Sequence, residues 1–323
     1  MRLAPVLLSS IALLISAPTP KSRSTQIRVS FWIENQAAES DERPSAEQPV
    51  EVCGKDIQVT LDGVRSRVLD MKCPHDELII LLVLDLSSGD LTTVDPAKEA
   101  LAAHIKKLPP TSYIGLLRAQ DGLRVLIDPT ANRDSVVQEI EQQTFSGKSG
   151  LLNTVETAGR IADSMLMKSS VRVAVLYVTD SDVRNYREDF TNPVINSSDS
   201  HDLSRRFPET LVQEKIVQLE GMLSMQQAPL FIVSLSQSRD RLNEAYQNGL
   251  KRMAEIAGGI AFFSRSTIEI PAEIQKAFET ISAQYTVTLA LPEHVSTRPQ
   301  IRLTLAESDR ALSYRTHLVL RGR

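Results

Sequence analysis

The sequence predicts an α/β protein with a doubly wound, mostly parallel sheet and flanking β strands from both chain ends. Three observations support this fold class. Leu78–Leu84 and Val171–Val178 are unbroken apolar runs, which are typical of strands buried on both faces of a parallel sheet. Strand-like and helix-like segments alternate from residue 78 to about residue 283. Strand-like segments without helices precede and follow that stretch.

Composition and charge exclude several classes of protein. The chain has 323 residues, of which 42% are hydrophobic and 24% are charged, as in ordinary globular proteins. These values exclude disorder, collagen and coiled coil for the chain as a whole. The net charge is -4 and only 5% of the residues are aromatic. This charge does not fit a general polyanion binder, and this aromatic content does not fit a stacking platform for single-stranded nucleic acid. We therefore expect no nucleic-acid partner.

The first 24 residues are expected to form a signal peptide. The short positive start Met1-Arg2 is followed by the mostly apolar run Leu3–Ala17, which is too short to span a membrane. Such a run is typical of a secretory signal, and an uncleaved N-terminal anchor is the alternative. No second long apolar run follows. We therefore expect a mature chain without a membrane span that is secreted or periplasmic.

Residues 25–77 are expected to form an N-terminal β segment. Gln26–Glu34 alternates between apolar and polar residues, as a half-buried strand does. The runs Ile57–Leu61 and Val64–Met71 are separated by Asp62-Gly63, a favoured two-residue hairpin turn. The sequence therefore predicts a hairpin made of these two runs.

The two cysteines, Cys53 and Cys73, stand at the outer ends of this hairpin, which a hairpin brings together. Paired cysteines tend to form a bridge in the oxidising compartment that an exported protein meets. We expect a disulfide, with two unpaired thiols as the alternative. The absence of a CxxC spacing argues against a zinc site.

Residues 78–283 are expected to form the central α/β domain, and residues 284–323 a C-terminal β segment. Asp95-Pro96 favours the start of a helix, with Asp95 as the N-cap. The remaining elements are predicted from apolar runs and helical spacing. The predicted strands are Tyr113–Leu117, Leu123–Ile127, Leu230–Leu235, Ile260–Phe263, Thr286–Leu291, Gln300–Ala306 and Leu312–Leu320, and helical stripes cover residues 136–140, 151–165, 211–223, 242–257 and 270–281. Residues 181–206 form an unusually long polar connection.

Oxygen-bearing side chains follow the predicted buried strands. Asp85 and Ser87 follow the run Leu78–Leu84, and Asp180 follows the run Val171–Val178. Ser149 lies in the loop before a predicted helix. Ligand sites in open α/β sheets lie beyond the carboxyl ends of the strands, so these side chains should converge there. Mg²⁺ prefers such carboxylate and hydroxyl oxygens, with waters completing an octahedron.

This pattern resembles the metal-ion-dependent adhesion site of the von Willebrand factor type A domain, a Rossmann-like fold. That family carries Asp-x-Ser-x-Ser on the first strand loop, a Thr on a second loop and an Asp after a later strand. Asp85 and Ser87 match the first Asp and Ser, Ser149 falls where the Thr is expected, and Asp180 matches the later Asp. Gly89 stands where the second Ser would be.

The resemblance covers residues 78–283. The whole chain also resembles a variant found in secreted acidobacterial proteins. That likeness rests on the Asp62-Gly63 hairpin and on the Gln284-Tyr285 pair before the last strands.

The resemblance implies an exported protein-interaction or adhesion module, not an enzyme, with a partly degenerate site for Mg²⁺ or Mn²⁺. In the family the hydroxyls usually touch the metal, the Asp residues often act through water, and a protein partner can supply a carboxylate. Gly89 removes one direct ligand. The alternative is a retired site, in which Asp85 and Asp180 only accept loop N–H bonds. In an empty site, repulsion between these two carboxylates would raise the pKa of one of them.

Two other functions remain open: a metal-dependent hydrolase that uses Asp85 and Asp180 as ligands, and a ligand-free structural module of the envelope. No G-x-S-x-G motif is present, and no catalytic residue is assigned. Gly147-Lys148-Ser149 matches only the end of a phosphate-binding loop, since Gln142 stands at the first glycine position.

Overall fold

The computed structural model describes residues 26–34, 53, 57–86, 91–144, 147–186, 208–306 and 310–320. The expected signal peptide lies outside the described residues, and so do Ser87, Gly89 and most of the polar stretch 181–206. No helix in the described ranges is long and apolar enough to cross a membrane. The boundaries proposed at residues 24, 77 and 283 stay predictions.

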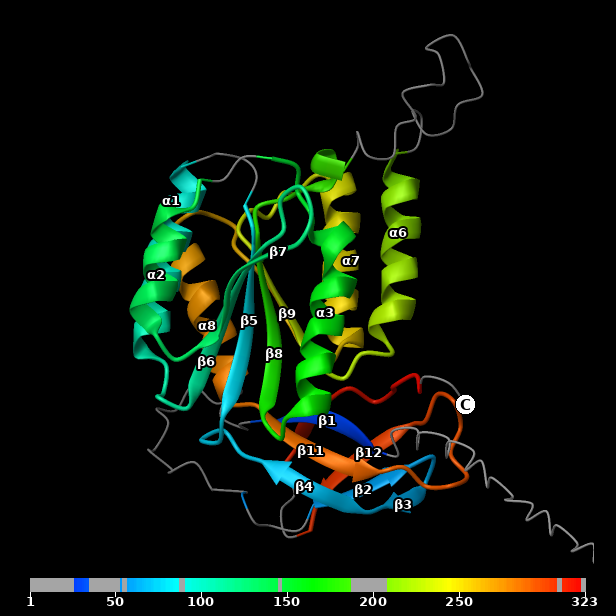
Figure 1. The fold of residues 1–323 in the computed structure, drawn as a ribbon. Coiled ribbons are helices and arrows are strands. Elements are labelled where there is room, and N and C mark those ends of the chain that lie inside the picture. The colour runs from blue at the N-terminus through cyan, green and yellow to red at the C-terminus, as the bar shows by residue number, and fades with distance from the viewer. Residues whose placement is uncertain are drawn as a thin grey trace, which may run out of the picture.

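A six-stranded sheet forms the centre of the molecule (Figure 1). Its order is β10-β9-β8-β5-β6-β7, and every neighbouring pair is parallel except β6 and β7. The strands are β5 (Leu78–Asp85), β6 (Ser112–Arg118), β7 (Arg124–Thr130), β8 (Arg172–Thr179), β9 (Leu230–Ser234) and β10 (Ala261–Phe263). The two unbroken apolar runs of the sequence are the two middle strands, β5 and β8. The predicted fold class and the predicted central strands are confirmed.

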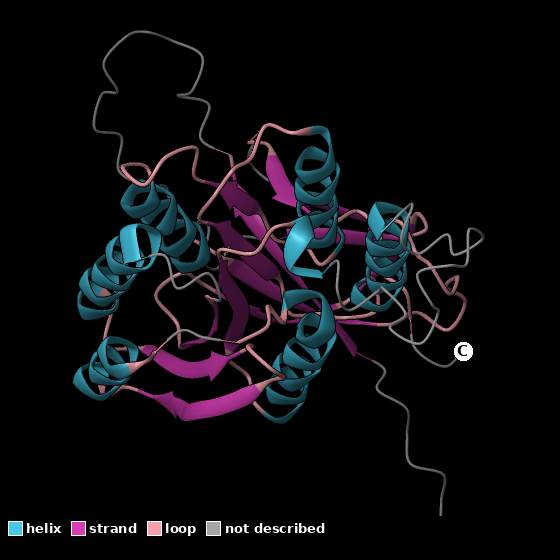
Figure 2. Cartoon of the chain, turned by 90° about the horizontal axis from the view of Figure 1, so that it is seen from above, coloured by secondary structure: helices cyan, strands magenta, loops and turns pink. Residues whose placement is uncertain are grey.

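Helices cover both faces of this sheet (Figures 1 and 2). One face packs against α1 (Leu91–Lys107), α2 (Arg133–Gln142) and α8 (Ile270–Ser282), and the other against α3 (Leu151–Lys168), α6 (Pro208–Leu223) and α7 (Arg241–Ile256). Successive residues of β5 alternate between the two cores. Ile80, Leu82 and Leu84 belong to the first core, and Leu81 and Val83 to the second. Both faces of β5 are therefore buried, which explains its unbroken apolar run.

The helix predicted to start at Asp95 begins earlier, and this prediction is wrong. Helix α1 starts at Leu91, so Pro96 lies inside it and Asp95 is not its N-cap. Thr93 and Val94 are buried on the same side as Ala97. The buried stripe thus extends one turn before the Asp-Pro pair, and this packing favours helix upstream of the local start signal.

Strands from both ends of the chain form two smaller sheets that share one core. The four-stranded sheet has the order β13-β1-β11-β4, and the three-stranded sheet β12-β2-β3. Their members are β1 (Gln26–Ile33), β2 (Ile57–Leu61), β3 (Val64–Ser66), β4 (Val68–Lys72), β11 (Tyr285–Ala290), β12 (Ile301–Leu305) and β13 (Leu312–Tyr314). The pairing of β1 with β11 and of β2 with β12 joins segments more than 200 residues apart. We call these two sheets the sandwich.

The predicted hairpin needs a correction at its second strand. Val64–Met71 is not one strand, because β3 pairs with β2 whereas β4 pairs with β11 in the other sheet. The chain changes sheets at Arg67, whose carbonyl accepts a bond from the N–H of Ala290. The turn itself is as predicted: Asp62 and Gly63 both have positive φ, 52° and 79°. Leu312–Leu320 is likewise strand only as far as Tyr314.

The predicted disulfide between Cys53 and Cys73 is present. The two Cα atoms lie 6.0 Å apart, within the range that a bridge allows. Cys73 is buried in the core of the sandwich. The bond therefore connects the segment before β2 to the end of β4.

A buried arginine connects the sandwich to the central sheet through hydrogen bonds. Arg172 starts β8 and is only 1% exposed. Its Nη1 donates to the carbonyls of Ser282 (3.1 Å) and Gln284 (3.0 Å), and its Nη2 to those of Pro74 and Asp76. One side chain thereby joins the end of α8 to both segments that lead out of and into the sandwich.

A candidate metal site at the carboxyl edge of the sheet

Asp85 lies at the point where the two central strands end together. It is the last residue of β5 and is paired in register with Thr179, the last residue of β8. Its backbone carbonyl accepts a hydrogen bond from the N–H of Asp180 at 3.3 Å. The parallel pairing thus places Asp85 and Asp180 beside each other at the carboxyl edge, as the sequence predicted.

The Asp85 carboxylate is completely buried and is held by three donors. Its Oδ1 accepts from the N–H of Gly150 (2.7 Å), and its Oδ2 from the N–H of Leu151 (3.3 Å) and the hydroxyl of Thr179 (2.9 Å). The two N–H groups belong to the start of α3, where backbone donors have no partner within the helix. Asp85 therefore caps α3 from a neighbouring strand.

Gly150 makes this approach possible. A Cβ atom at this position would lie 1.6 Å from the carbonyl oxygen of Ala119. The loop before α3 is pressed against the chain just after β6, and a side chain would push it away. The glycine therefore allows the N–H of Gly150 to reach Asp85.

Burial is the main reason why the pKa of Asp85 is raised to about 6, and the nearby charge of Asp180 raises it further. The hydrogen bonds from Gly150, Thr179 and Leu151 act in the opposite direction. The sequence led us to expect a raised pKa from repulsion between the carboxylates. The direction agrees, but repulsion is the smaller cause.

The structure brings three of the four predicted site residues to one place. Ser149 is only 3% exposed and directly precedes Gly150, whose N–H contacts Asp85. Asp180 is half-buried beside Asp85. Ser87, the fourth residue, lies outside the described residues, and its place in the site stays a prediction.

Sequence reasoning missed a chain of buried hydroxyls behind Asp85. The Thr179 hydroxyl contacts that of Ser181 at 2.6 Å, and the Ser181 hydroxyl contacts that of Tyr246 at 3.1 Å. This chain connects the carboxylate with η2 (Val183–Tyr186) and α7, because the rings of Tyr186 and Tyr246 pack 5.9 Å apart. The only sequence signal was position, since Thr179 and Ser181 flank Asp180.

Gln120 was also missed. It is fully buried just after β6, and its Nε2 donates to the carbonyl of Leu86 at 2.6 Å. This bond holds the chain immediately after Asp85. The Oε1 atom of the same side chain is buried without a hydrogen-bond partner in the described part of the molecule. An acceptor on the Gln120 side chain, which contacts Leu86, is thus left over.

The donors present fit a hydrated divalent cation better than a dehydrated one. No three His, Cys, Asp or Glu side chains of the described residues gather into a metal-binding group. Three donors already occupy the Asp85 carboxylate, which has about four lone-pair positions. The other predicted ligands that the structure describes are the Asp180 carboxylate and the Ser149 hydroxyl. Mg²⁺ commonly keeps several waters and uses one or two carboxylates, so the set is chemically compatible with it.

The same region is similar in sequence to a known family of domains. In sequence, the family model of the von Willebrand factor type A domain matches residues 80–182, the stretch that contains Asp85, Ser149 and Asp180. A search of the curated proteins gives no match to this chain.

Solved structures that are similar to this chain include two that are named after von Willebrand factor. A von Willebrand factor type A protein from Catenulispora acidiphila is 10% identical with a TM-score of 0.46, over 85% of this chain and 75% of that one. The von Willebrand factor domain of the type V pili tip protein Mfa5 from Porphyromonas gingivalis is 13% identical with a TM-score of 0.45, over 64% and 95%. The PilB minor pilin from Streptococcus sanguinis is 8% identical with a TM-score of 0.46, over 64% and 62%.

Proposed function

We propose that this protein is an exported protein-interaction module whose binding surface is the carboxyl edge of the six-stranded sheet. One observation carries the proposal: Asp85, Ser149 and Asp180 lie together where β5 and β8 end. The match of residues 80–182 to the type A family supports it, because that region holds all three residues. No catalytic role is assigned to any residue of the site.

The site would hold Mg²⁺ or Mn²⁺ through Ser149, Asp180 and Ser87, with Asp85 positioned behind them. The cation would supply an open coordination position for a carboxylate of a protein partner. Asp85 fixes the start of α3, and thereby the backbone next to Ser149. Since Mg²⁺ gives up its waters reluctantly and Gly89 provides no ligand, the affinity should be modest, about millimolar.

Export is supported by the disulfide between Cys53 and Cys73. Structural disulfides persist mainly in oxidising compartments, outside the cytosol. This fits the expected signal peptide and a secreted or periplasmic location. The likeness to secreted acidobacterial proteins belongs to the same proposal.

A ligand-free structural role is the second candidate, and the hydrogen bonds of Asp85 favour it. With three donors on the carboxylate, Asp85 already has a structural function as the cap of α3. The two candidates differ in the role of Asp180, which is half-buried at the edge and so within reach of solvent. In a ligand-free structural module, replacement of Asp180 would not change the binding of any partner, because no ligand is held at this site.

A capture experiment separates these roles. Tagged wild-type protein is incubated with envelope extract in Mg²⁺ or in EDTA, alongside Asp180→Ala and the control Asp128→Asn, an exposed carboxylate on β7. We expect a partner that wild type and Asp128→Asn retain in Mg²⁺ and release in EDTA, and that Asp180→Ala does not retain. Capture that is equal in all arms would refute a metal-dependent binding surface.

A further inference from the structure

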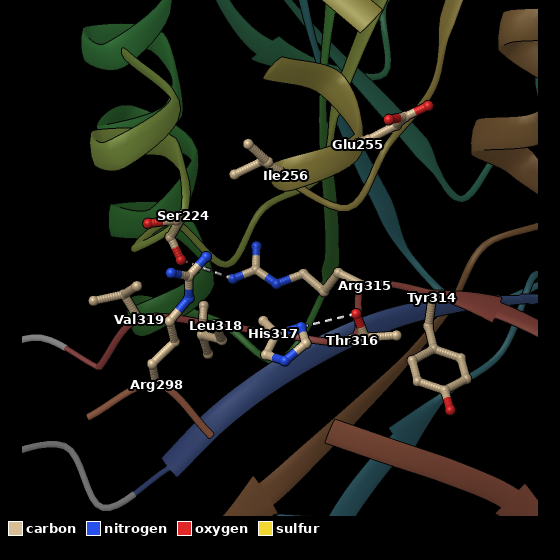
Figure 3. Close-up of a pocket in the computed structure, with 10 residues that line it drawn as sticks. All are labelled: Ser224, Glu255, Ile256, Arg298, Tyr314, Arg315, Thr316, His317, Leu318 and Val319. Atoms are coloured by element: carbon tan, nitrogen blue, oxygen red, sulfur yellow. Dashed lines mark hydrogen bonds between the residues drawn. The ribbon is translucent and has the colours of Figure 1, made fainter. Parts of the chain in front are cut away.

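A pocket of about 270 Å³ lies at the opposite edge of the sheet from Asp85 (Figure 3). Helices α6 and α7 end there, close to the sandwich (Figure 1). Ser224, Glu255 and Ile256 form one wall, and the segment Tyr314–Val319 together with Arg298 forms the rest. The pocket is therefore built from the central domain and the C-terminal segment together.

Positive groups dominate this pocket. Two arginines, Arg298 and Arg315, line it, against one carboxylate, Glu255. Glu255 already has Lys251 at 3.9 Å. Arg298 is exposed and has no hydrogen bond or ion pair with any residue that the structure describes. The guanidinium of Arg298 is thus available to a ligand.

Arg315 is the buried cation of the pocket, at 7% exposure. Its Nη1 donates to the carbonyls of Gln226 and Ala257, and its Nη2 to that of Ser224. Its Nε is buried and has no hydrogen-bond partner among the described residues. Figure 3 shows the guanidinium groups of Arg298 and Arg315 both turned toward Ser224.

The position of Arg315 is fixed by its surroundings. Gly258, which follows α7 with φ of 82°, would place a Cβ only 2.9 Å from Cδ of Arg315. The glycine leaves the space through which this side chain passes. Arg315 is therefore held in place before any ligand arrives, which lowers the entropic cost of binding.

We propose that this pocket binds a small organic anion, a carboxylate or a phosphate ester. Its oxygens would accept from the unpaired Nε of Arg315 and from the guanidinium of Arg298, and such charge-assisted bonds are the strong ones. Ile256, in the wall of the pocket, provides apolar surface for the carbon part of the ligand. The volume lies below the range of drug-sized pockets, so the ligand is small. This pocket is separate from the candidate metal site, which lies at the other edge of the sheet.

Isothermal titration calorimetry with inorganic phosphate and with succinate, at constant ionic strength in chloride, tests the proposal. We expect saturable binding of at least one probe, and the one that binds more tightly identifies the class of anion. Arg298→Gln should weaken it about tenfold or more, since a hydrogen bond to a charged group is lost. Glu255→Gln should strengthen it by removing a like charge. Arg302→Gln, an exposed arginine on β12, should leave it unchanged.

A second measurement addresses the buried donor directly. The ¹⁵N NMR resonance of the Arg315 Nε–H group should shift as the bound probe saturates, and it should shift less in Arg298→Gln at the same concentration. Absence of saturable binding for both probes would overturn the proposal. Equal affinity in wild type and Arg298→Gln would overturn it as well, because the anion would then bind elsewhere.

Discussion

The two edges of the central sheet bury charges of opposite sign. At the carboxyl edge the buried group is an anion, Asp85, held by the N–H groups that start α3. At the amino edge the buried groups are cations. Arg172 and Arg315 are held by carbonyls at or just after the ends of α6, α7 and α8. Each edge accepts the charge that its helix termini favour, because helix starts are positive and helix ends negative.

Both edges hold a buried charge at helix ends, but these buried charges have different roles. At the amino edge, the buried arginines join segments that are distant in sequence and so hold the sandwich in place. At the carboxyl edge, Asp85 fixes one loop, and Asp180 lies half-buried beside it. The amino edge is therefore an anchor for the sandwich besides lining the proposed anion pocket, and the carboxyl edge presents the half-buried carboxylate of Asp180.

The largest effect should come from breaking the anchor. Arg172→Met leaves four carbonyls without their donor, at about 1–3 kcal/mol each before water and neighbouring groups compensate. We expect the free energy of unfolding to fall by about 3–5 kcal/mol in urea denaturation. Arg124→Met, at an exposed position of β7, should change it by less than about 0.5 kcal/mol. A loss below about 1 kcal/mol for Arg172→Met would show that the anchor is dispensable.

The second prediction concerns pH at the other edge. The pKa of Asp85 is about 6 in the folded chain, roughly two above its usual value, so ionising it costs the folded state about 3 kcal/mol. This cost is absent below about pH 4, where the carboxyl is protonated in both states, and is complete above about pH 6. Wild type should therefore lose about 3 kcal/mol of stability across this interval relative to Asp85→Asn. Parallel profiles of urea denaturation against pH would contradict the buried, raised carboxyl.

The disulfide gives an effect of similar size within the sandwich. Replacing both Cys53 and Cys73 by serine should lower the free energy of unfolding by about 3 kcal/mol, as the chain-entropy model gives for a loop of about 20 residues. Thiol labelling of wild type folded under oxidising conditions should find no reactive group. Two labelled thiols per chain would disprove the bridge.

A smaller loss is expected at Gly150. Its replacement by alanine forces the loop away from Ala119 and lengthens the bond to Asp85, at about 2 kcal/mol. Gly221→Ala is the matched control, because Gly221 lies in α6 with nothing within 4 Å of the added Cβ. That variant should be more stable by about 0.5–1 kcal/mol through helix propensity. The melting temperatures of Gly150→Ala and Gly221→Ala are compared by thermal unfolding. Equal melting temperatures of the two variants would show that there is no tight contact at Gly150.

Local patterns were enough to predict most of the fold. The apolar runs of β5 and β8 identified the middle of the sheet, and Asp62-Gly63 identified a turn. Patterns failed where distant packing decides the outcome. Arg172 and Arg315 look like ordinary solvated charges at strand ends, and only the sandwich, built from both chain ends, buries them. The change of sheet at Arg67 depends on the same long-range pairing.

In the candidate site, the two carboxylates could be predicted from the sequence. The polar side chains around them could not. Asp85 and Asp180 follow long apolar runs, a position that signals the carboxyl edge of a sheet. Thr179, Ser181 and Gln120 carry no spacing signal, since hydroxyls and amides are common in loops. Their roles arise from register and burial, which appear only when β5, β6 and β8 are side by side.

Binding of a cation beside Asp180 can be measured by titrating Mn²⁺ into wild type and Asp180→Ala. Electron paramagnetic resonance then counts the bound ions. We expect one saturable site in wild type at about millimolar affinity, and none in Asp180→Ala. At ten times the dissociation constant, bound metal should stabilise wild type by about 1.4 kcal/mol. Absence of saturable Mn²⁺ binding in wild type, or equal binding in Asp180→Ala, would show that no cation binds beside Asp180 and would leave Asp85 as a structural cap.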